Sequence, residues 1–115
     1  MAQEKEEDDR TAGREHRAAE AAGLRADVLE AREQLDEALR IRQHQVLPVY
    51  EKLGDRITLV RGRRITARIL LQRDHSGDRP EAERLLRQAL LDAEAMRIPE
   101  ADTLRGILRE NGFEP

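Results

Sequence analysis

The feature that most constrains this chain is an approximate internal repeat. The stretch LDEALRIRQHQVLPVYEKLGD at 35–55 returns in degenerate form as PEAERLLRQALLDAEAMRIP at 80–99, at an offset of 44 residues set by a shared EA pair. The segment before each copy also recurs, as ADVL at 26–29 and ARIL at 67–70, at an offset of 41 residues. Two helices repeated at a period near forty residues are typical of a helical solenoid, so the repeat predicts an all-α fold.

Apolar residues at spacings of three and four predict a series of amphipathic helices along the chain. The first of them has few large apolar residues and should be the least stable if nothing covers its outer face. Its weak apolar stripe consists of Ala18, Ala22, Leu24, Val28, Leu29 and Ala31. The last predicted helix is polar outside one apolar side, as a solvent-facing cap should be. The predicted helices span residues 14–33, 36–53, 56–73, 79–97 and 99–110.

Several residues predict where these helices begin, bend and end. Asp36 is a candidate N-cap, and Pro48 should bend the second helix because it removes one intrahelical hydrogen bond. Gly54 fits a left-handed position after that helix. Asp78 and Glu81 match a D-x-x-E capping box. The turn between the first two helices contains neither Gly nor Pro, so fusion into one long helix is an open alternative.

Charge is unevenly distributed along the chain. The formal net charge is −3, and residues 1–20, with four basic and seven acidic side chains, account for all of it. Apart from Met1, residues 1–12 contain no large apolar side chain that could offset the entropy of ordering. We therefore expect a disordered acidic tail over 1–13, with an acidic interaction arm as the alternative, and one helical domain over 14–112.

The composition also excludes several classes of protein. The chain has no Cys, so it has no disulfide framework and no thiol nucleophile, and its three His lack a metal-binding spacing. No apolar run approaches the length of a membrane span or a signal peptide, which favours a cytoplasmic location. No phosphate-binding glycine motif is present, so we expect no cofactor and no enzymatic activity. Arginine-rich, lysine-poor usage suggests a bacterial source with a GC-rich genome.

Four stretches carry a family resemblance: ADVLEA at 26–31, LDEALRI at 35–41, LPVYEKLGDR at 47–56 and ARILLQ at 67–72. They resemble the tetratricopeptide repeat (TPR) family, of the long-helix kind found in bacterial multi-repeat regulators and scaffolds. The resemblance covers about residues 20–100. It implies an α-solenoid of two stacked helix-turn-helix repeats plus a C-terminal capping helix, and a scaffold that binds peptides or proteins without catalysis.

The chain departs from the family pattern in two respects that bear on its assembly. Glu33 stands where the family usually has a glycine between the paired helices. Only two repeats are visible, although about three are usually needed for independent stability. The chain is therefore expected to be part of a longer array, a degenerate relic of one, or a protein that pairs with another copy.

In that family, the first helix of each repeat lines a concave face that binds the partner. Two interpretations of the charged residues there are open: they pair with each other between helices, or Arg64 and Arg68 hold a carboxylate of an acidic partner. The Asp74-His75-Ser76 stretch has the residue types of a hydrolase triad but is expected to be an ordinary loop. Carried over by position, the face holds Glu20, Asp27, Glu30, Arg61, Arg64 and Arg68.

The sequence therefore favours a non-catalytic protein-interaction module that binds a peptide or protein, with an acidic partner as one candidate. The first alternative is a self-associating structural helical bundle or homo-oligomer. The second is a small nucleic-acid-associated regulator using Arg61, Arg63 and Arg64. Nucleic-acid binding is disfavoured because residues 21–115 carry equal numbers of acids and bases and no aromatic residue interrupts the arginine run.

Overall fold

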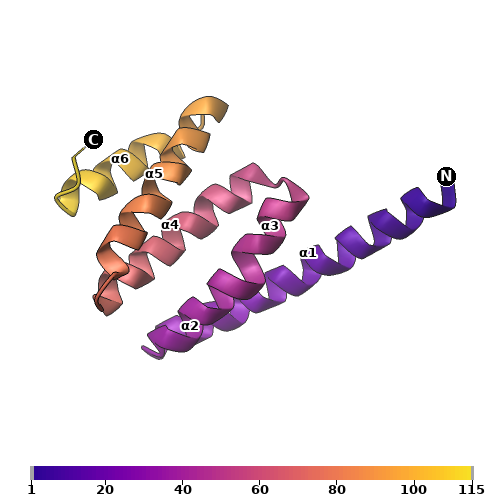
Figure 1. The fold of residues 1–115 in the computed structure, drawn as a ribbon, viewed down its shortest axis with the longest axis horizontal. Coiled ribbons are helices and arrows are strands. Elements are labelled where there is room, and N and C mark those ends of the chain that lie inside the picture. The colour runs from indigo at the N-terminus through magenta and orange to yellow at the C-terminus, as the bar shows by residue number, and fades with distance from the viewer. Residues whose placement is uncertain (1, 115) are drawn as a thin grey trace. The chain divides into compact units, whose positions relative to one another are not determined.

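The computed structural model describes residues 2–114, and all regular structure within that range is helical, as the repeat predicted (Figure 1). The chain divides into two compact units, one ending at Asp55 and the other beginning at Arg56. The first unit contains three α-helices and one π-helical turn, and the second contains three α-helices. In chain order the elements are α1 (Ala2–Ala31), α2 (Leu35–Ile41), η1 (Arg42–Val46), α3 (Leu47–Leu53), α4 (Arg56–Arg73), α5 (Asp78–Met96) and α6 (Glu100–Glu110).

The first two predicted helices are separate. The turn between α1 and α2 places Glu33 in the left-handed region, with φ 60°, although no glycine is present. The amide of Gln34 donates to the carbonyl of Leu29 at 2.8 Å, and the amide of Glu33 donates to that of Glu30 at 2.9 Å. These bonds close the end of α1 in the manner of a Schellman motif. The prediction that Asp36 caps α2 is wrong, because Gln34 holds the N-cap position and Asp36 lies inside the first turn.

The interruption expected at Pro48 takes the form of a π-helical turn. The turn η1 directly precedes α3, in which Pro48 lies in the first turn. A proline inside a regular α-helix lacks an amide donor and its ring clashes with the carbonyl four residues earlier. A π-turn widens the backbone at that point, so α2 and α3 are joined through η1. Gly54 ends α3 with φ 70°, which confirms its predicted left-handed position.

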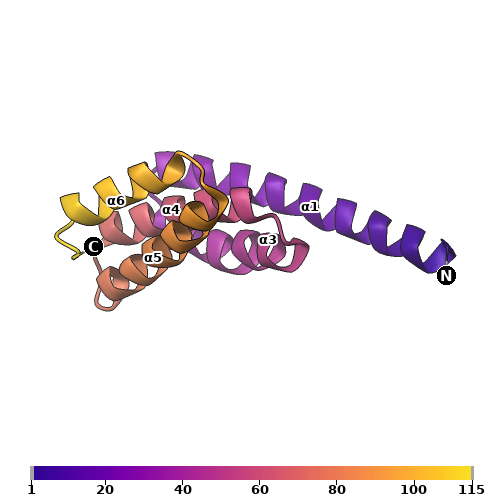
Figure 2. The same ribbon diagram turned by 90° about the horizontal axis from the view of Figure 1, so that it is seen from above.

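The first unit is a helical hairpin in which α2, η1 and α3 all contact α1 (Figure 1). On α1 the buried side is made of alanines, which let the facing helix approach closely. Figure 2 shows the N-terminal part of α1 continuing past the end of α3. That part includes residues 2–13, which the sequence predicts to be a disordered tail, and this prediction remains untested. Met1 lies outside the described residues. The buried residues are Ala19, Ala22 and Ala26 on α1, and Ala38, Leu39, Val46, Leu47 and Tyr50 on the facing segment.

The second unit is a hairpin of α4 and α5, with α6 packed against α5. Its boundaries lie within one residue of the predicted helices, and its core is richer in large aliphatic side chains than that of the first unit. The predicted capping box at Asp78 is wrong, since Gly77 precedes α5 without a side-chain cap. The buried core residues include Leu59, Val60, Ile69, Leu70, Leu85, Leu86, Leu104 and Leu108.

The C-terminal end is fastened to α5 by two arginines. Phe113 is buried, and the guanidinium carbon of Arg79 lies 4.4 Å from the centroid of its ring, within the range of a cation–π contact. Arg79 also donates to the carbonyl of Asn111, and Arg87 donates to the carbonyl of Glu114. The residues after α6 are therefore held against α5, the helix that α6 itself contacts. Stacking of the two hairpins into a solenoid involves both units and stays a prediction.

Candidate functional site

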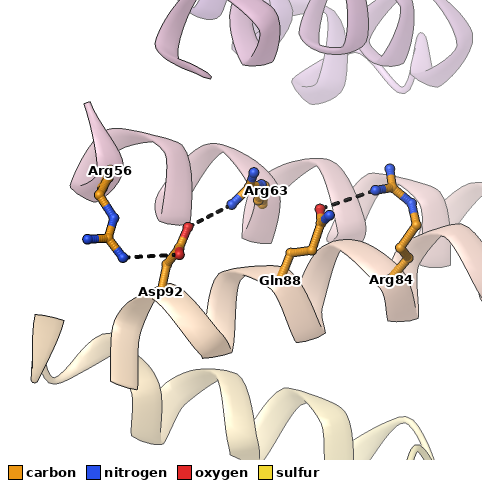
Figure 3. Close-up of polar contacts among 5 residues, drawn as sticks. All are labelled: Arg56, Arg63, Arg84, Gln88 and Asp92. Atoms are coloured by element: carbon orange, nitrogen blue, oxygen red, sulfur yellow. Dashed lines mark hydrogen bonds and ion pairs between the residues drawn. The ribbon is translucent and has the colours of Figure 1, made fainter. Parts of the chain in front are cut away.

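The arginines of α4 are divided between two faces of the helix. Arg63 is buried and turned toward α5, where its Nη1 donates to Oδ2 of Asp92 at 2.9 Å. The other carboxylate oxygen of Asp92 accepts from Nη2 of Arg56 at 3.2 Å. Figure 3 shows the two guanidinium groups converging on this one carboxylate. Arg63 therefore takes part in the α4–α5 contact and is not available to a ligand.

Three other arginines lie on a different side of α4. Arg61, Arg64 and Arg68 follow one another at spacings of three and four residues, which places them on one helical face. Arg61 and Arg68 are exposed, and Arg64 is half-buried. We call these three residues the arginine face. Ile57, four residues before Arg61 and 44% exposed, extends the same side toward the start of the helix.

The members of the arginine face differ in their existing contacts. Among residues 9–114, neither Arg61 nor Arg64 takes part in a hydrogen bond or an ion pair. Arg68, in contrast, does have a polar partner. Two guanidinium groups, three residues apart, are therefore the part of this face that can accept a new acidic ligand without giving up a contact.

The predicted acidic residues of the site belong to the first unit. Asp27 accepts a hydrogen bond on Oδ1 from Nη2 of the buried Arg42 at 2.5 Å. Glu30 is half-buried and also has a polar partner, and Glu20 lies 3.2 Å from Nδ1 of His16. Each acid is therefore already engaged in a contact. Because these acids and the arginine face lie on different units, a single concave face that includes both stays a prediction.

The weak apolar stripe predicted for the first helix is in fact two stripes. Ala19, Ala22 and Ala26 are buried, whereas Leu24 and Val28 are 67% and 52% exposed. Val28 also lines a shallow groove of about 390 Å³ between α1 and α2. Helical spacing alone could have separated the stripes, because a residue lies on nearly the opposite side of a helix from one two positions away. The other groove residues are Arg25, Leu29, Glu37 and Ile41.

The loop between α4 and α5 is organised by an ion pair. Asp78 accepts from Nε and Nη2 of Arg73 at 2.8 and 2.7 Å, and from the amide of His75 at 3.0 Å. These contacts, above all the hydrogen bonds from Arg73, hold the pKa of Asp78 below its usual value. His75 and Ser76 are exposed, and the carboxylate of Asp78 near them is neutralised by Arg73. Arg73 and Asp78 thus have a structural role in closing this turn.

The pKa shifts of the other titratable groups also have structural causes. Burial raises the pKa of Tyr50, with Glu20 and Asp55 adding to the effect, and the ring of His16 packs edge-on against it at 5.7 Å. Hydrogen bonds from Arg84 lower the pKa of Glu81. Across the part of the chain that the structure describes, no three His, Cys, Asp or Glu residues are grouped so that they could hold a metal ion. None of the described helices combines the length and apolar character needed to cross a bilayer.

Comparison of the chain with protein-family models, with curated proteins and with solved structures gave no match. The arrangement of the side chains is therefore the basis for the function proposed below.

Proposed function

We propose that this chain is a non-catalytic protein-interaction module that binds an acidic peptide segment along the arginine face of α4. The observation that carries this proposal is the division of the α4 arginines. Arg63 is engaged by Asp92 inside the hairpin, whereas Arg61 and Arg64 make no polar contact with the side chains described, those of residues 9–114. The α4–α5 hairpin thus presents two uncommitted guanidinium groups on one side of α4.

Arginine suits this role for physical reasons. Its guanidinium is planar, always charged, and able to form two parallel hydrogen bonds with one carboxylate. The half-buried position of Arg64 limits its freedom, so less side-chain entropy is lost when it binds. Arg61 is more exposed, and its contribution should be weaker and more sensitive to salt.

The resemblance to tetratricopeptide repeats supports the same class of function. Each unit contains a helix-turn-helix hairpin, which is the building block of such an array. In this interpretation the hairpins stack as a two-repeat solenoid capped by α6, with α1 and α4 lining the binding face in the cytoplasm of a bacterium. Asp27 and Glu30 would then flank the arginine face and favour a partner that also carries a basic residue.

Binding of nucleic acid is the less favoured function. That alternative relied on Arg61, Arg63 and Arg64 acting together on phosphates. Because Arg63 is buried and paired with Asp92, the run supplies two cations instead of three. Affinity for nucleic acid grows with the number of phosphates neutralised, so this loss weakens the case.

The proposal is tested by titrating the protein into a fluorescein-labelled peptide of six glutamates and following fluorescence anisotropy. The Arg61→Ala/Arg64→Ala variant should bind about tenfold more weakly, which corresponds to about 1.4 kcal/mol shared between two partly exposed charge contacts. The Arg40→Ala/Arg109→Ala variant removes the same charge from exposed sites elsewhere and should bind as the wild type does. Equal affinities for both variants would reject the arginine face as the site. A labelled oligonucleotide of the same charge, bound more tightly than the peptide, would favour the nucleic-acid alternative.

A further inference from the structure

The outer side of α1 carries a row of apolar side chains that its own hairpin leaves uncovered. These residues are spaced three, four and three apart, which is the a and d spacing of a coiled coil. All four are exposed, and Leu24 and Val28 contribute the largest apolar surface, at 67% and 52% exposed. We call this row the α1 seam; it consists of Ala21, Leu24, Val28 and Ala31.

The seam lies opposite the buried side of the same helix. Ala19, Ala22 and Ala26 face α2 and α3 and have at most 1% of their surface exposed. At 3.6 residues per turn, the seam residues lie on the far side of the helix from these alanines. The helix is thus apolar on two sides, and its own unit covers one of them. A helix of this pattern is suited to packing between two partners.

Charged residues border the seam with opposite signs on its two edges. Glu20 and Asp27 lie along one edge, at the positions just before Ala21 and Val28. Arg25 and Arg32 lie along the other edge, at the positions just after Leu24 and Ala31. In coiled-coil terms the acids occupy g positions and the bases occupy e positions, which are the positions that set partner choice and orientation.

We propose that the α1 seam pairs with the seam of a second copy of this chain, with the two helices parallel. In a parallel pair each g residue faces the e residue five positions later on the other helix. Glu20 then meets Arg25 of the second copy, and Asp27 meets Arg32 of the second copy. In an antiparallel pair acids would face acids and arginines would face arginines, so the charge pattern selects the parallel arrangement.

The contacts that these charged residues already make are compatible with such pairing. His16 contacts Glu20 at 3.2 Å, and Arg25 donates to Oε1 of Gln45 at 3.1 Å, both on exposed surface where such contacts contribute little. Asp27 uses Oδ1 for its bond from Arg42, and a carboxylate has a second oxygen that can accept from a partner.

The length of the seam limits the strength of the pairing. One heptad before Ala21 and Leu24, the a and d positions hold Arg14 and Arg17, whose like charges would repel across a parallel pair. At the other end α1 stops at Ala31. The seam therefore extends over about 16 Å of helix. Val28, Leu29 and Ile41 in the adjoining groove continue the apolar surface onto α2. We expect a weak dimer that forms with rising concentration.

The orientation is tested by disulfide trapping, which is simple because the chain contains no cysteine. In a parallel pair the two Ala21 residues face each other, so the Ala21→Cys variant should form a disulfide-linked dimer under mild oxidation. In an antiparallel pair Ala21 would face Ala31 of the other copy. Preferential linkage between Ala21→Cys and Ala31→Cys chains in a mixture would therefore overturn the parallel arrangement. Ala18→Cys, an exposed position on the same helix but off the seam, is the control and should cross-link at least tenfold more slowly.

The pairing itself is tested by sedimentation equilibrium of the full chain from micromolar to millimolar concentration. The apparent mass should rise from 13.2 kDa toward twice that value. The Leu24→Ser/Val28→Ser variant should remain monomeric, with unchanged helicity because both side chains are exposed. The Arg25→Glu and Glu20→Arg variants should each dissociate at least tenfold more readily, and an equimolar mixture should recover association. A wild-type chain that stays monomeric throughout would overturn the proposal and would leave the test of Arg61 and Arg64 on α4 unaffected.

Discussion

The two hairpins differ in the side chains that pack between their own helices. The buried side chains of α1 that face α2 and α3 are alanines, whereas α4 buries Val60, Ile69 and Leu70. Burial of apolar surface stabilises a fold by about 25 cal/mol per Å², so the second hairpin gains more from its core. The second hairpin is thus the firmer scaffold, which suits a helix that must hold arginines in place for a ligand. The first has close-packed small residues and an uncovered outer face, which suits association.

The ion pairs that join helices within each hairpin also differ. In the second unit Asp92 accepts from both Arg56 and Arg63. In the first unit the buried Arg42 bonds to the exposed Asp27, and its Nε is buried without a hydrogen-bond partner in the described part of the chain. A buried donor without a partner costs about 1–3 kcal/mol. In the first hairpin the unpaired Nε of Arg42 therefore offsets part of what its bond to Asp27 contributes, whereas Arg63 of the second hairpin is held by the carboxylate of Asp92.

The largest loss of stability is expected when a core side chain of the second hairpin is truncated. Leu86 is fully buried, and Leu86→Ala should lower the free energy of unfolding by about 2–5 kcal/mol. Ala26→Gly, in the alanine face of α1, should cost about 1 kcal/mol, mainly through helix propensity. Urea denaturation followed by circular dichroism measures both. A smaller loss for Leu86→Ala than for Ala26→Gly would contradict the assignment of the stronger core to the second hairpin.

A matched pair of arginine substitutions sharpens the comparison of the ion pairs. Arg63→Met should destabilise the protein by about 1–2 kcal/mol, because it removes a charge-assisted bond to Asp92. Arg42→Met should change the stability by less than about 1 kcal/mol or raise it, since it removes a buried donor and leaves Asp27 solvated. Thermal melts of the two variants under the same buffer provide the test. A clear loss for Arg42→Met would show that this cation is stabilising.

A smaller effect is expected from pH, and it should arise in the second unit. The pKa of Asp78 is lowered in the folded state, mainly by hydrogen bonds from Arg73. Its contribution to stability is therefore complete above the unfolded pKa of about 3.9 and is lost as the pH falls through the folded pKa. Asp78→Asn should reduce stability at neutral pH and flatten the acid side of the stability curve. An unchanged acid limb in this variant would argue against the Arg73 contact.

The sequence predicted the helices well because their signals are local. The predicted span 56–73 matches α4 at both ends, and the left-handed glycine after the second helix lies where its position required. The α1–α2 turn was harder, because Glu33 adopts a positive φ that favours glycine. A non-glycine residue can occupy this region when the surrounding hydrogen bonds hold it there, and no local pattern reports that.

The functional surfaces were less predictable, because they depend on which residues other helices cover. The arginine run reads as one cationic cluster, yet Arg63 faces α5 while Arg61 and Arg64 do not. Asp78 has the sequence context of a capping box, but Arg73, five residues earlier, binds its carboxylate instead. Helical periodicity could have separated the two sides of each helix, but the partner that covers a side comes only from the tertiary structure.

The most direct test of the proposed function is an amide chemical-shift titration of the full chain with the six-glutamate peptide. The account predicts that the largest shifts fall on α4 around Arg61 and Arg64 and that Asp92 on α5 does not shift. In Arg61→Ala/Arg64→Ala the same shifts should need about tenfold more peptide to reach half of their full size. Shifts concentrated on the first unit, or an unchanged half-saturating peptide concentration in the double variant, would contradict it.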